Sequence, residues 1–237
     1  MRNGWRIEER VAPAGELHAA WPSVEADPAV RAVARCRPTT TAVVLGSTQP
    51  VDTVDGMALA SSGWELVRRR SGGGAVLVDP DDPVWIDVWV PTGDPLATTD
   101  VTAAFAWLGV AWGTALRGLG LTGVDVQGDG PGACTRWSGQ VCFGGVGSGE
   151  VTVDGRKVVG LSQRRNRRGA WFHGAGLLHW EPTRLLGVLA LSDDERSAAA
   201  TGLRPAAAGI ADVARAQGLP LVPTAESVTA ALVHALS

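Results

Sequence analysis

The sequence predicts an α+β fold in which helices flank a mixed β-sheet. Short β-branched or alternating stretches recur through the first three quarters of the chain, separated by glycine, proline and aspartate. From about Pro182 the chain becomes alanine-rich and its apolar residues follow a helical spacing. With 237 residues, 45% of them hydrophobic, it is long enough for one sizeable core. We therefore expect a sheet-containing domain over residues 1–182 and a short helical segment over residues 183–237 packed on it.

Five strands are expected in the first part of the chain, over residues 5–11, 39–45, 64–69, 75–78 and 84–90. A long helix follows, because Asp100 is a favourable N-cap and the apolar residues from Ala104 to Leu116 recur at helical spacing. Gly118 and Gly120 mark its end. We expect this helix to pack on the sheet.

The second half begins with short strands expected over residues 124–127 and 140–144, followed by a β-hairpin over residues 151–161. The turn of this hairpin is Asp154-Gly155, a strong signal for a two-residue type I′ turn. A further strand is expected over residues 169–180. The last part of the chain shows three helix starts, at Ser192, after Pro205 and after Thr224.

The composition argues against several classes of function. A net charge of −3 is not that of a general nucleic-acid binder, which gathers a basic excess on one face. The longest apolar run, residues 103–116, is too short to span a bilayer. Without the apolar core of a signal peptide near the N-terminus, a cytoplasmic location is expected. Three cysteines without Cys-x-x-Cys spacing and four scattered histidines favour neither a disulfide framework nor a bound metal.

Lys157 is the only lysine in the chain, and every other residue among the 21 Lys+Arg is an arginine. A coding bias towards arginine explains the missing lysines but not the one that remains. Arginine carries a permanently charged planar fork, whereas lysine carries a compact charge whose pKa burial can lower. Lys157 also follows the tight turn of the hairpin, which fixes its backbone. We therefore expect a catalytic or substrate-fixing role for Lys157.

A glycine-rich loop lies between two predicted strands, with the sequence Arg69-Arg70-Ser71-Gly72-Gly73-Gly74-Ala75. Consecutive glycines allow close approach of the backbone to a ligand and form an anion-binding nest of N–H groups, and neighbouring arginines add charged donors. The loop is not a Walker A motif, because no Gly-Lys-Ser/Thr follows it, and it is not a dinucleotide-binding turn, because a strand is expected next. It suits a phosphate or a carboxylate.

Taken together, the motifs resemble a known family. Arg-Arg-x-Ser-Gly-Gly-Gly-Ala-Val, Gly-Arg-Lys-Val-x-Gly, Ser-Gln-Arg-Arg and His-Gly-x-x-Leu-Leu occur in that order between Arg68 and Leu178. This is similar to the lipoate-protein ligase A family, within the superfamily of biotin/lipoyl protein ligases and octanoyltransferases. The resemblance implies an α+β catalytic domain over residues 1–182 that attaches a lipoyl or octanoyl group to a lysine of an acceptor carrier domain.

The resemblance also implies a site and its ligands. Lys157 is implied to contact the acyl carbonyl and the phosphate of an acyl-adenylate, so that ATP, Mg²⁺ and lipoate or octanoate are the expected substrates and cofactors. An ammonium aimed there stabilises charge that develops on the carbonyl oxygen. The residues implied to bind the acyl group or its adenylate are Arg69, Ser71, Gly72, Gly73, Gly74, Ala75, Gly160, Ser162 and His173.

Departures from the ligase pattern leave an alternative open. Cys142-Phe143 stands where the ligases have an Asn-Asp pair, and this resembles the cysteine-dependent octanoyltransferases of the same superfamily. Cys142 would then carry the acyl group as a thioester, since a thiolate is the reactive form of cysteine. The glycine loop argues the other way, because those transferases have arginine where this chain has Gly74. Cys36 and Cys134 lie outside the matched motifs, and no chemical role is expected for them.

The partners are implied by the same resemblance. The acceptor is expected to be the lipoyl carrier domain of a 2-oxoacid dehydrogenase or an H-type protein of glycine cleavage, and an acyl carrier protein is a possible donor. The residues after Pro182 are too few for the separate C-terminal domain common in ligases, so an accessory partner chain is a further option. The arginines of residues 164–168 suit docking of an acidic carrier. A protein that binds the acyl ligand without catalysis remains the alternative of another class.

Overall fold

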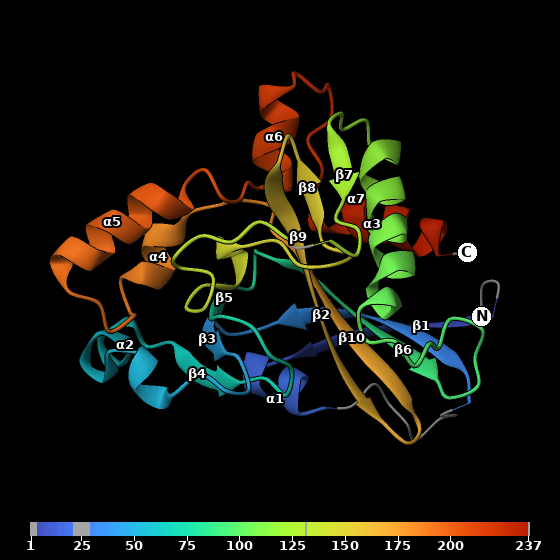
Figure 1. Cartoon of the computed structure of the whole chain (residues 1–237), viewed down its shortest axis with the longest axis horizontal. Coiled ribbons are helices and arrows are strands. Elements are labelled where there is room, and N and C mark those ends of the chain that lie inside the picture. The colour runs from blue at the N-terminus through green and yellow to red at the C-terminus, as the bar shows by residue number, and fades with distance from the viewer. Residues whose placement is uncertain (1–3, 21–28, 131, 237) are drawn as a thin grey trace.

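Two β-sheets form the frame of the molecule in the computed structural model, which describes residues 4–20, 29–130 and 132–236 (Figure 1). The larger sheet has seven strands in the order β1-β2-β6-β10-β9-β8-β7, and the smaller has three in the order β4-β3-β5. The strands of the larger sheet are β1 (Trp5–Ala12), β2 (Arg31–Pro38), β6 (Val84–Pro91), β10 (Gly169–Gly176), β9 (Arg156–Asn166), β8 (Val151–Val153) and β7 (Val124–Val126). Those of the smaller sheet are β3 (Ala42–Leu45), β4 (Glu65–Arg68) and β5 (Val76–Val78).

Both sheets are mixed, which confirms the predicted α+β class. In the larger sheet β1 and β2 run parallel, while β2, β6, β10, β9, β8 and β7 pair antiparallel in turn. In the smaller sheet β3 is parallel to β4 and antiparallel to β5. All eight residues of β6 are buried, because this central strand is covered on both faces.

Three helices cover one face of the larger sheet, namely α3 (Ala106–Gly118), α6 (Ile210–Ala216) and α7 (Ala225–Ala235). The other helices of the described residues are α1 (Ala14–Ala19), α2 (Gly56–Ser62), α4 (Pro182–Leu186) and α5 (Asp193–Leu203). Trp112 of α3, Ile210 of α6 and Leu232 of α7 belong to one buried core with Ile86 of β6 and Phe172 of β10. On the opposite face, Leu17 of α1 and residues of β3 and β5 share a core with Trp85 and Cys36.

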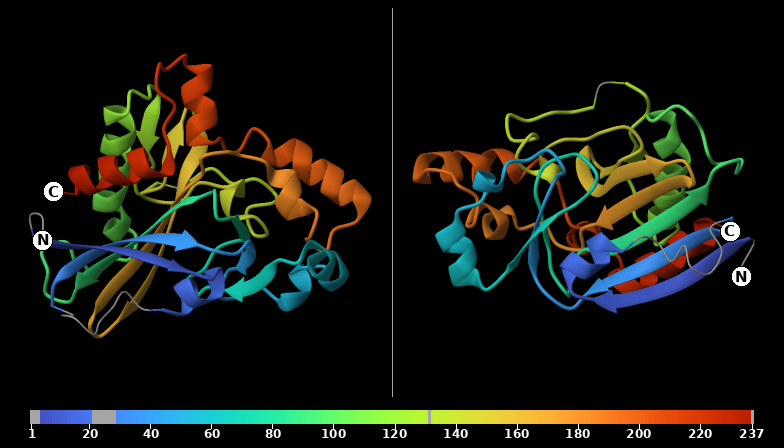
Figure 2. Two further views of the ribbon diagram at one scale, coloured as in Figure 1. Left: turned by 180° about the vertical axis from the view of Figure 1, so that it is seen from behind. Right: turned by 90° about the horizontal axis from the view of Figure 1, so that it is seen from below.

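The C-terminal segment is divided between the two sheets. Figure 2 shows α5 beside α2 at one end of the molecule and α7 beside α3 at the other. Leu185 of α4 and Leu203 of α5 pack with Val43 and Leu45 of the smaller sheet, whereas α6 and α7 pack on the larger one. The segment therefore contributes to both cores, and the boundary at residue 182 stays a prediction.

Several local predictions are confirmed. Asp154 and Gly155 have φ values of 50° and 76°, as a type I′ turn requires, and join β8 to β9. Ser192 forms a capping box with Glu195 at the start of α5, and Thr224 forms one with Ser227 at the start of α7. No helix in the described part of the chain is both long and apolar enough to cross a membrane.

Other predictions were wrong. Strand β2 was not predicted, because its run of small residues and arginines lacks a clear period of two, although it lies in the middle of the sheet. Residues 140–144 contain the 3₁₀ turn η3 (Cys142–Gly144) instead of a strand. Strand β10 ends at Gly176, short of residue 180. The predicted helix start at Asp100 is shifted: its carboxylate accepts from the N–H groups of Thr102 and Ala103, but the 3₁₀ turn η2 (Ala103–Phe105) comes first and α3 begins at Ala106.

Candidate active site

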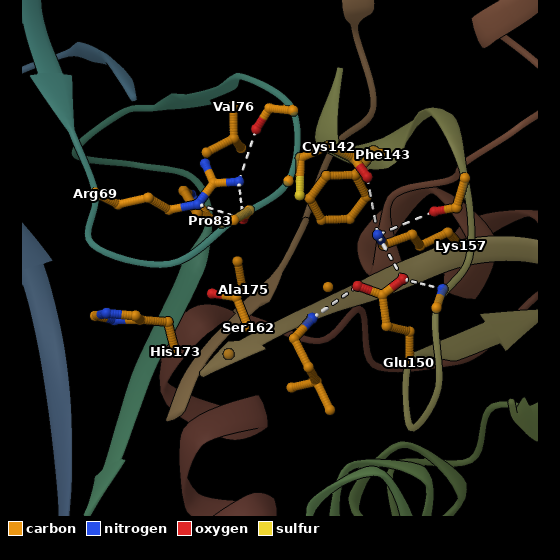
Figure 3. A pocket seen from close by; sticks show the side chains of 18 of the residues that line it. Arg69, Val76, Pro83, Cys142, Phe143, Glu150, Lys157, Ser162, His173 and Ala175 are labelled. Carbon is orange, nitrogen blue, oxygen red and sulfur yellow. Dashed lines mark hydrogen bonds and ion pairs between the residues drawn. The ribbon is translucent and has the colours of Figure 1, made fainter. Parts of the chain in front are cut away.

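A cavity of about 280 Å³ lies between the glycine loop, which joins β4 to β5, and the strands β9, β10 and β6 (Figure 3). We call it the slot. Nine residues that the sequence analysis singled out line it: Arg69, Gly72, Gly73, Gly74, Cys142, Lys157, Gly160, Ser162 and His173. Ser71 and Ala75 act from behind this lining, through Ser162 and Cys142 respectively. One cavity thus brings together motifs that are about 100 residues apart along the chain.

Arg69 holds the glycine loop in shape. Its guanidinium donates hydrogen bonds to the carbonyl oxygens of Gly72 and Gly74, both at 2.8 Å, and to that of Val44 at 3.3 Å. The residue is only 5% exposed. Gly73 has a φ of 100°, which favours glycine. The arginine expected to face a ligand therefore serves first as an internal brace.

The amide groups of the glycine loop have no acceptor within the described part of the protein. Among the residues that the structure describes, the N–H groups of Gly72, Gly73 and Gly74 donate no hydrogen bond. All three glycines line the slot. A run of unpaired backbone donors beside a cavity is suited to an oxyanion or a phosphate.

The glycine loop also positions Cys142. The N–H of Cys142 donates to the carbonyl of Ala75 at 2.9 Å, and the N–H of Ala75 donates to that of Gln140 at 2.7 Å. A Cβ placed on Gly74 would lie 2.6 Å from the carbonyl carbon of Val141 and 2.7 Å from the nitrogen of Cys142. This contact is the physical reason for glycine at position 74, where the resembling transferases have arginine.

Lys157 is buried in a complete network of acceptors. Its Nζ lies 2.6 Å from a carboxylate oxygen of Glu150 and donates to the carbonyls of Cys142 at 2.9 Å and Gly145 at 3.0 Å. An ammonium has three donors, so all of them have partners here. Lys157 is 2% exposed, and its Nζ also lies 4.9 Å from the ring centre of Phe143.

Glu150 is a site residue to which the sequence analysis assigned no role. Besides its ion pair with Lys157, it accepts hydrogen bonds from the N–H groups of Gly147 at 2.7 Å and Leu161 at 3.0 Å. Glu150 is 6% exposed. An acidic residue directly before the β-branched strand β8, and only a few residues before the single lysine, was the signal that sequence reasoning missed.

Gly160 and Ser162 complete the wall on β9. A Cβ on Gly160 would lie 3.5 Å from Nζ of Lys157 and 3.4 Å from the ring of Phe143, so the strand packs closely against the lysine side chain here. The hydroxyl of Ser162 lies 2.9 Å from that of Ser71, which ties β9 to the glycine loop.

His173 stands on the side of the slot away from Lys157 and Glu150 (Figure 3). Its Nδ1 lies 2.7 Å from a carboxylate oxygen of Asp87, which also accepts a hydrogen bond from the Trp85 indole at 2.7 Å. Burial opposes ionisation of Asp87, but His173 and these hydrogen bonds hold the pKa of its carboxyl below the usual value. Asp87 was also missed, although an aspartate inside the apolar strand β6 is conspicuous.

The other two cysteines differ in position. Cys134 is exposed and lines the slot, although it lies outside the motifs that the sequence analysis matched. Cys36 is buried outside the slot, where burial and the nearby Asp87 raise the pKa of its thiol well above the usual value. Within the described residues, no group of three or more histidine, cysteine or acidic side chains is arranged to hold a metal ion.

Comparison with known proteins gives relatives over part of the chain. Octanoyltransferase LipM of Kyrpidia tusciae is 34% identical over 143 residues, which are 60% of this chain and 52% of that protein. Octanoyltransferase LipM of Moorella thermoacetica is 30% identical over 141 residues, covering 60% and 50% of the two chains. The aligned region thus spans about half the length of these curated relatives.

Solved structures share the fold. A bipartite lipoate protein ligase from Thermoplasma acidophilum superposes with a TM-score of 0.69 at 21% identity, over 98% of this chain and 83% of that one. A biotin protein ligase from Leishmania major, in complex with biotin, has a TM-score of 0.54 at 12% identity, over 97% and 72% of the two chains. The sequence itself matches the lipoyl protein ligase A/B catalytic domain over residues 24–237. The chain therefore belongs to the lipoyl protein ligase A/B catalytic domain family.

Proposed function

We propose that this protein is an acyltransferase that places an octanoyl or lipoyl group on a lysine of a carrier domain through a thioester on Cys142. The observation that carries the proposal is the position of Cys142 in the wall of the slot. The glycine loop holds its N–H, and Lys157 holds its carbonyl. The relatives named octanoyltransferase support the same reading.

The first half-reaction loads the cysteine. The thiolate of Cys142 attacks the acyl carbonyl of a thioester donor, such as an acyl carrier protein, and the donor's sulfur leaves and takes up a proton. Negative charge develops on the carbonyl oxygen during the attack. Amides of the glycine loop that have no protein partner stabilise that charge.

The second half-reaction transfers the acyl group. The neutral amine of the acceptor lysine attacks the thioester carbonyl, the C–S bond breaks, and the proton lost by the amine returns to the sulfur of Cys142. The product is an amide on the carrier domain, and the free thiol is restored. A slot walled by Val76, Phe143 and Leu161 limits the access of water to the thioester.

Replacement of the cysteine tests this function. Cys142→Ser is expected to abolish transfer from an octanoyl thioester to the acceptor domain, because a serine hydroxyl is a much poorer nucleophile. Cys134→Ser is the matched control, since that thiol also lines the slot. Intact mass should show a hydroxylamine-sensitive octanoyl adduct on wild-type protein and on Cys134→Ser, but not on Cys142→Ser. Full turnover by Cys142→Ser would contradict the thioester mechanism.

A lipoate-protein ligase acting through an acyl-adenylate is the second candidate. It is favoured by the unpaired amides of Gly72, Gly73 and Gly74, which suit the phosphate of an adenylate. In that case ATP activates free lipoate or octanoate, and Lys157 faces the mixed anhydride. The test supplies free octanoate with ATP and Mg²⁺ in place of the thioester donor. ATP-dependent transfer that survives Cys142→Ser would establish the ligase.

The partners follow from either mechanism. The acceptor is a lipoyl carrier domain of a 2-oxoacid dehydrogenase or an H-type protein, and the exposed arginines near the turn between β9 and β10 suit docking of an acidic carrier. One neighbour in fold was solved as a bipartite ligase with its E2 lipoyl domain, so an accessory chain remains part of the ligase alternative. Binding of octanoate without transfer under either set of conditions would indicate a non-catalytic acyl-binding protein.

A further inference from the structure

The side of the slot that holds His173 contains a second histidine, His18 of α1. The ring centre of His18 lies 5.5 Å from that of His173 and 4.2 Å from that of Trp85. His18 lines the slot and is 7% exposed. His18 therefore lies beside His173, which Figure 3 shows on the side of the slot away from Lys157 and Glu150.

His18 is a buried polar group without a partner. Neither of its ring nitrogens makes a hydrogen bond with any residue that the structure describes. Asp87 does not serve it: its Oδ1 pairs with Trp85 and His173, and its Oδ2 has no hydrogen-bond partner among the described residues. Burial, followed by the neighbouring His173, lowers the pKa of His18 to about 3. Near neutral pH its ring is uncharged, with one N–H donor and one acceptor nitrogen.

An unpaired buried donor destabilises the protein, and a ligand can remove that cost by supplying the missing partner. The Trp85 ring packs against the imidazole at a tilt of 32°, so this end of the slot presents a hydrogen-bonding group whose position is fixed before a ligand binds. Between it and Lys157 the wall is largely apolar, formed by residues such as Val76, Phe143 and Ala175. A straight hydrocarbon fits that apolar stretch but leaves His18 unsatisfied.

We infer that His18 is a specificity-determining residue that selects acyl chains with an oxygen or sulfur atom near the end remote from the carboxyl group. The inference rests on the proposed function, which places the acyl carbonyl beside Lys157 and the tail towards His18. A plain octanoyl group offers no acceptor or donor there. A site built to hydrogen-bond a ligand discriminates against an analogue that lacks the matching group.

The test compares three free acids, octanoate, 8-hydroxyoctanoate and lipoate, by calorimetric binding to the full chain and by competition in the transfer assay. In wild-type protein, 8-hydroxyoctanoate or lipoate should bind about 2- to 10-fold more tightly than octanoate, as one net hydrogen bond predicts. His18→Leu should remove that advantage. His18→Gln, which keeps a donor and an acceptor, should retain part of it.

His179→Leu is the matched control, because His179 is half-exposed, pairs with Asp212 and lies outside the slot lining. It should keep the wild-type order of the three acids. Equal affinities for all three acids in wild-type protein would overturn the inference even if His18→Leu failed to fold. An advantage that persists in folded His18→Leu would also overturn it. If either of these results is found while octanoate is still bound and transferred, the inference about His18 fails but the proposed function survives. If the protein binds none of the three acids, the inference and the proposed function both fail.

Discussion

The two ends of the slot are built in opposite ways. At the end that holds Lys157, the ammonium has three acceptors and its carboxylate partner Glu150 accepts two further amides. At the end that holds His18, a buried imidazole has no hydrogen-bond partner among the described residues. The first end is preorganised before any ligand arrives, as charge stabilisation in a buried site requires. At the second end the ring nitrogens of His18 have hydrogen-bonding capacity that a bound ligand would use, which is the arrangement that recognition of a polar group requires.

The largest effect is expected at the preorganised end, from Lys157→Arg. Charge is retained, but a planar fork does not place three donors on Glu150, Cys142 and Gly145 within the space of an ammonium. We expect transfer to fall about 100-fold, because a changed hold on the carbonyls of Cys142 and Gly145 misplaces the reacting thiol. Steady-state kinetics with an unchanged circular dichroism spectrum would check it. Near-normal turnover by the variant would make Lys157 a bystander.

Next in size is the effect of Glu150→Gln, which leaves the buried ammonium without its counter-charge. Breaking a buried ion pair costs about 3–5 kcal/mol of the free energy of unfolding. Glu9→Gln is the matched control, since Glu9 pairs with Arg37 at 3.1 Å on the surface, where such a pair contributes at most about 1 kcal/mol. Urea denaturation of both variants measures the two losses. Equal losses would mean that the Lys157 network is not preorganised in the way described.

A smaller loss is expected for Gly74→Ala, which tests the contact between the glycine loop and Cys142. The added methyl group meets the backbone at 2.6 Å, and overpacking of this kind costs about 1–3 kcal/mol. Gly72→Ala is the control for stability, because a Cβ there meets no atom within 4 Å. Thermal unfolding should show a lower Tm for Gly74→Ala only. If both variants melt alike, the loop does not press on the cysteine turn.

The smallest effect concerns pH at the unpaired end. His18 has its pKa lowered from 6.5 to about 3, so the unfolded chain binds more protons at this residue than the folded chain between those values. Stability from this residue is therefore present above pH 6.5 and is lost as pH falls, by at most about 1.4 kcal/mol for each pH unit.

His18→Gln should accordingly lose less stability than wild type between pH 7 and pH 5. Asp82 acts in the opposite direction, because burial raises its pKa to about 6 and its contribution grows as pH falls. It is present in both proteins and cancels in the difference. The ionisable neighbours of His18, namely His173, Asp87 and Arg69, are likewise shared. Urea titrations at the two pH values measure the difference, and identical pH dependence would show that His18 is not held neutral by the fold.

Local signals in the sequence were sufficient for much of the architecture. The Asp154-Gly155 turn, the capping residues Ser192 and Thr224, and the apolar period after Asp100 each specify an element through interactions within a few residues. The single lysine and the glycine loop indicated two parts of the site for the same reason, since each stands out against its immediate surroundings. These signals do not require knowledge of the folded chain.

Features that depend on contacts between residues far apart in the sequence were decided only by the tertiary structure. Strand β2 is a strand because β1 and β6 lie on either side of it, and its small residues fill a buried face. Cys142 lies in a turn rather than a strand, and its N–H donates to the carbonyl of Ala75. The backbone of Lys157 forms hydrogen bonds with Ala206 and Ala208 of the C-terminal segment. Sequence order alone cannot show such contacts.

The same distinction separates the two ends of the slot. Sequence by itself determined that a lysine, a cysteine and a glycine loop occur in the order of a known family. Only the folded structure showed that Glu150 completes the lysine network and that His18, more than 50 residues before the loop, reaches the opposite end of the slot. Whether a polar group is satisfied depends on which distant groups surround it, and that is settled only when the chain has packed.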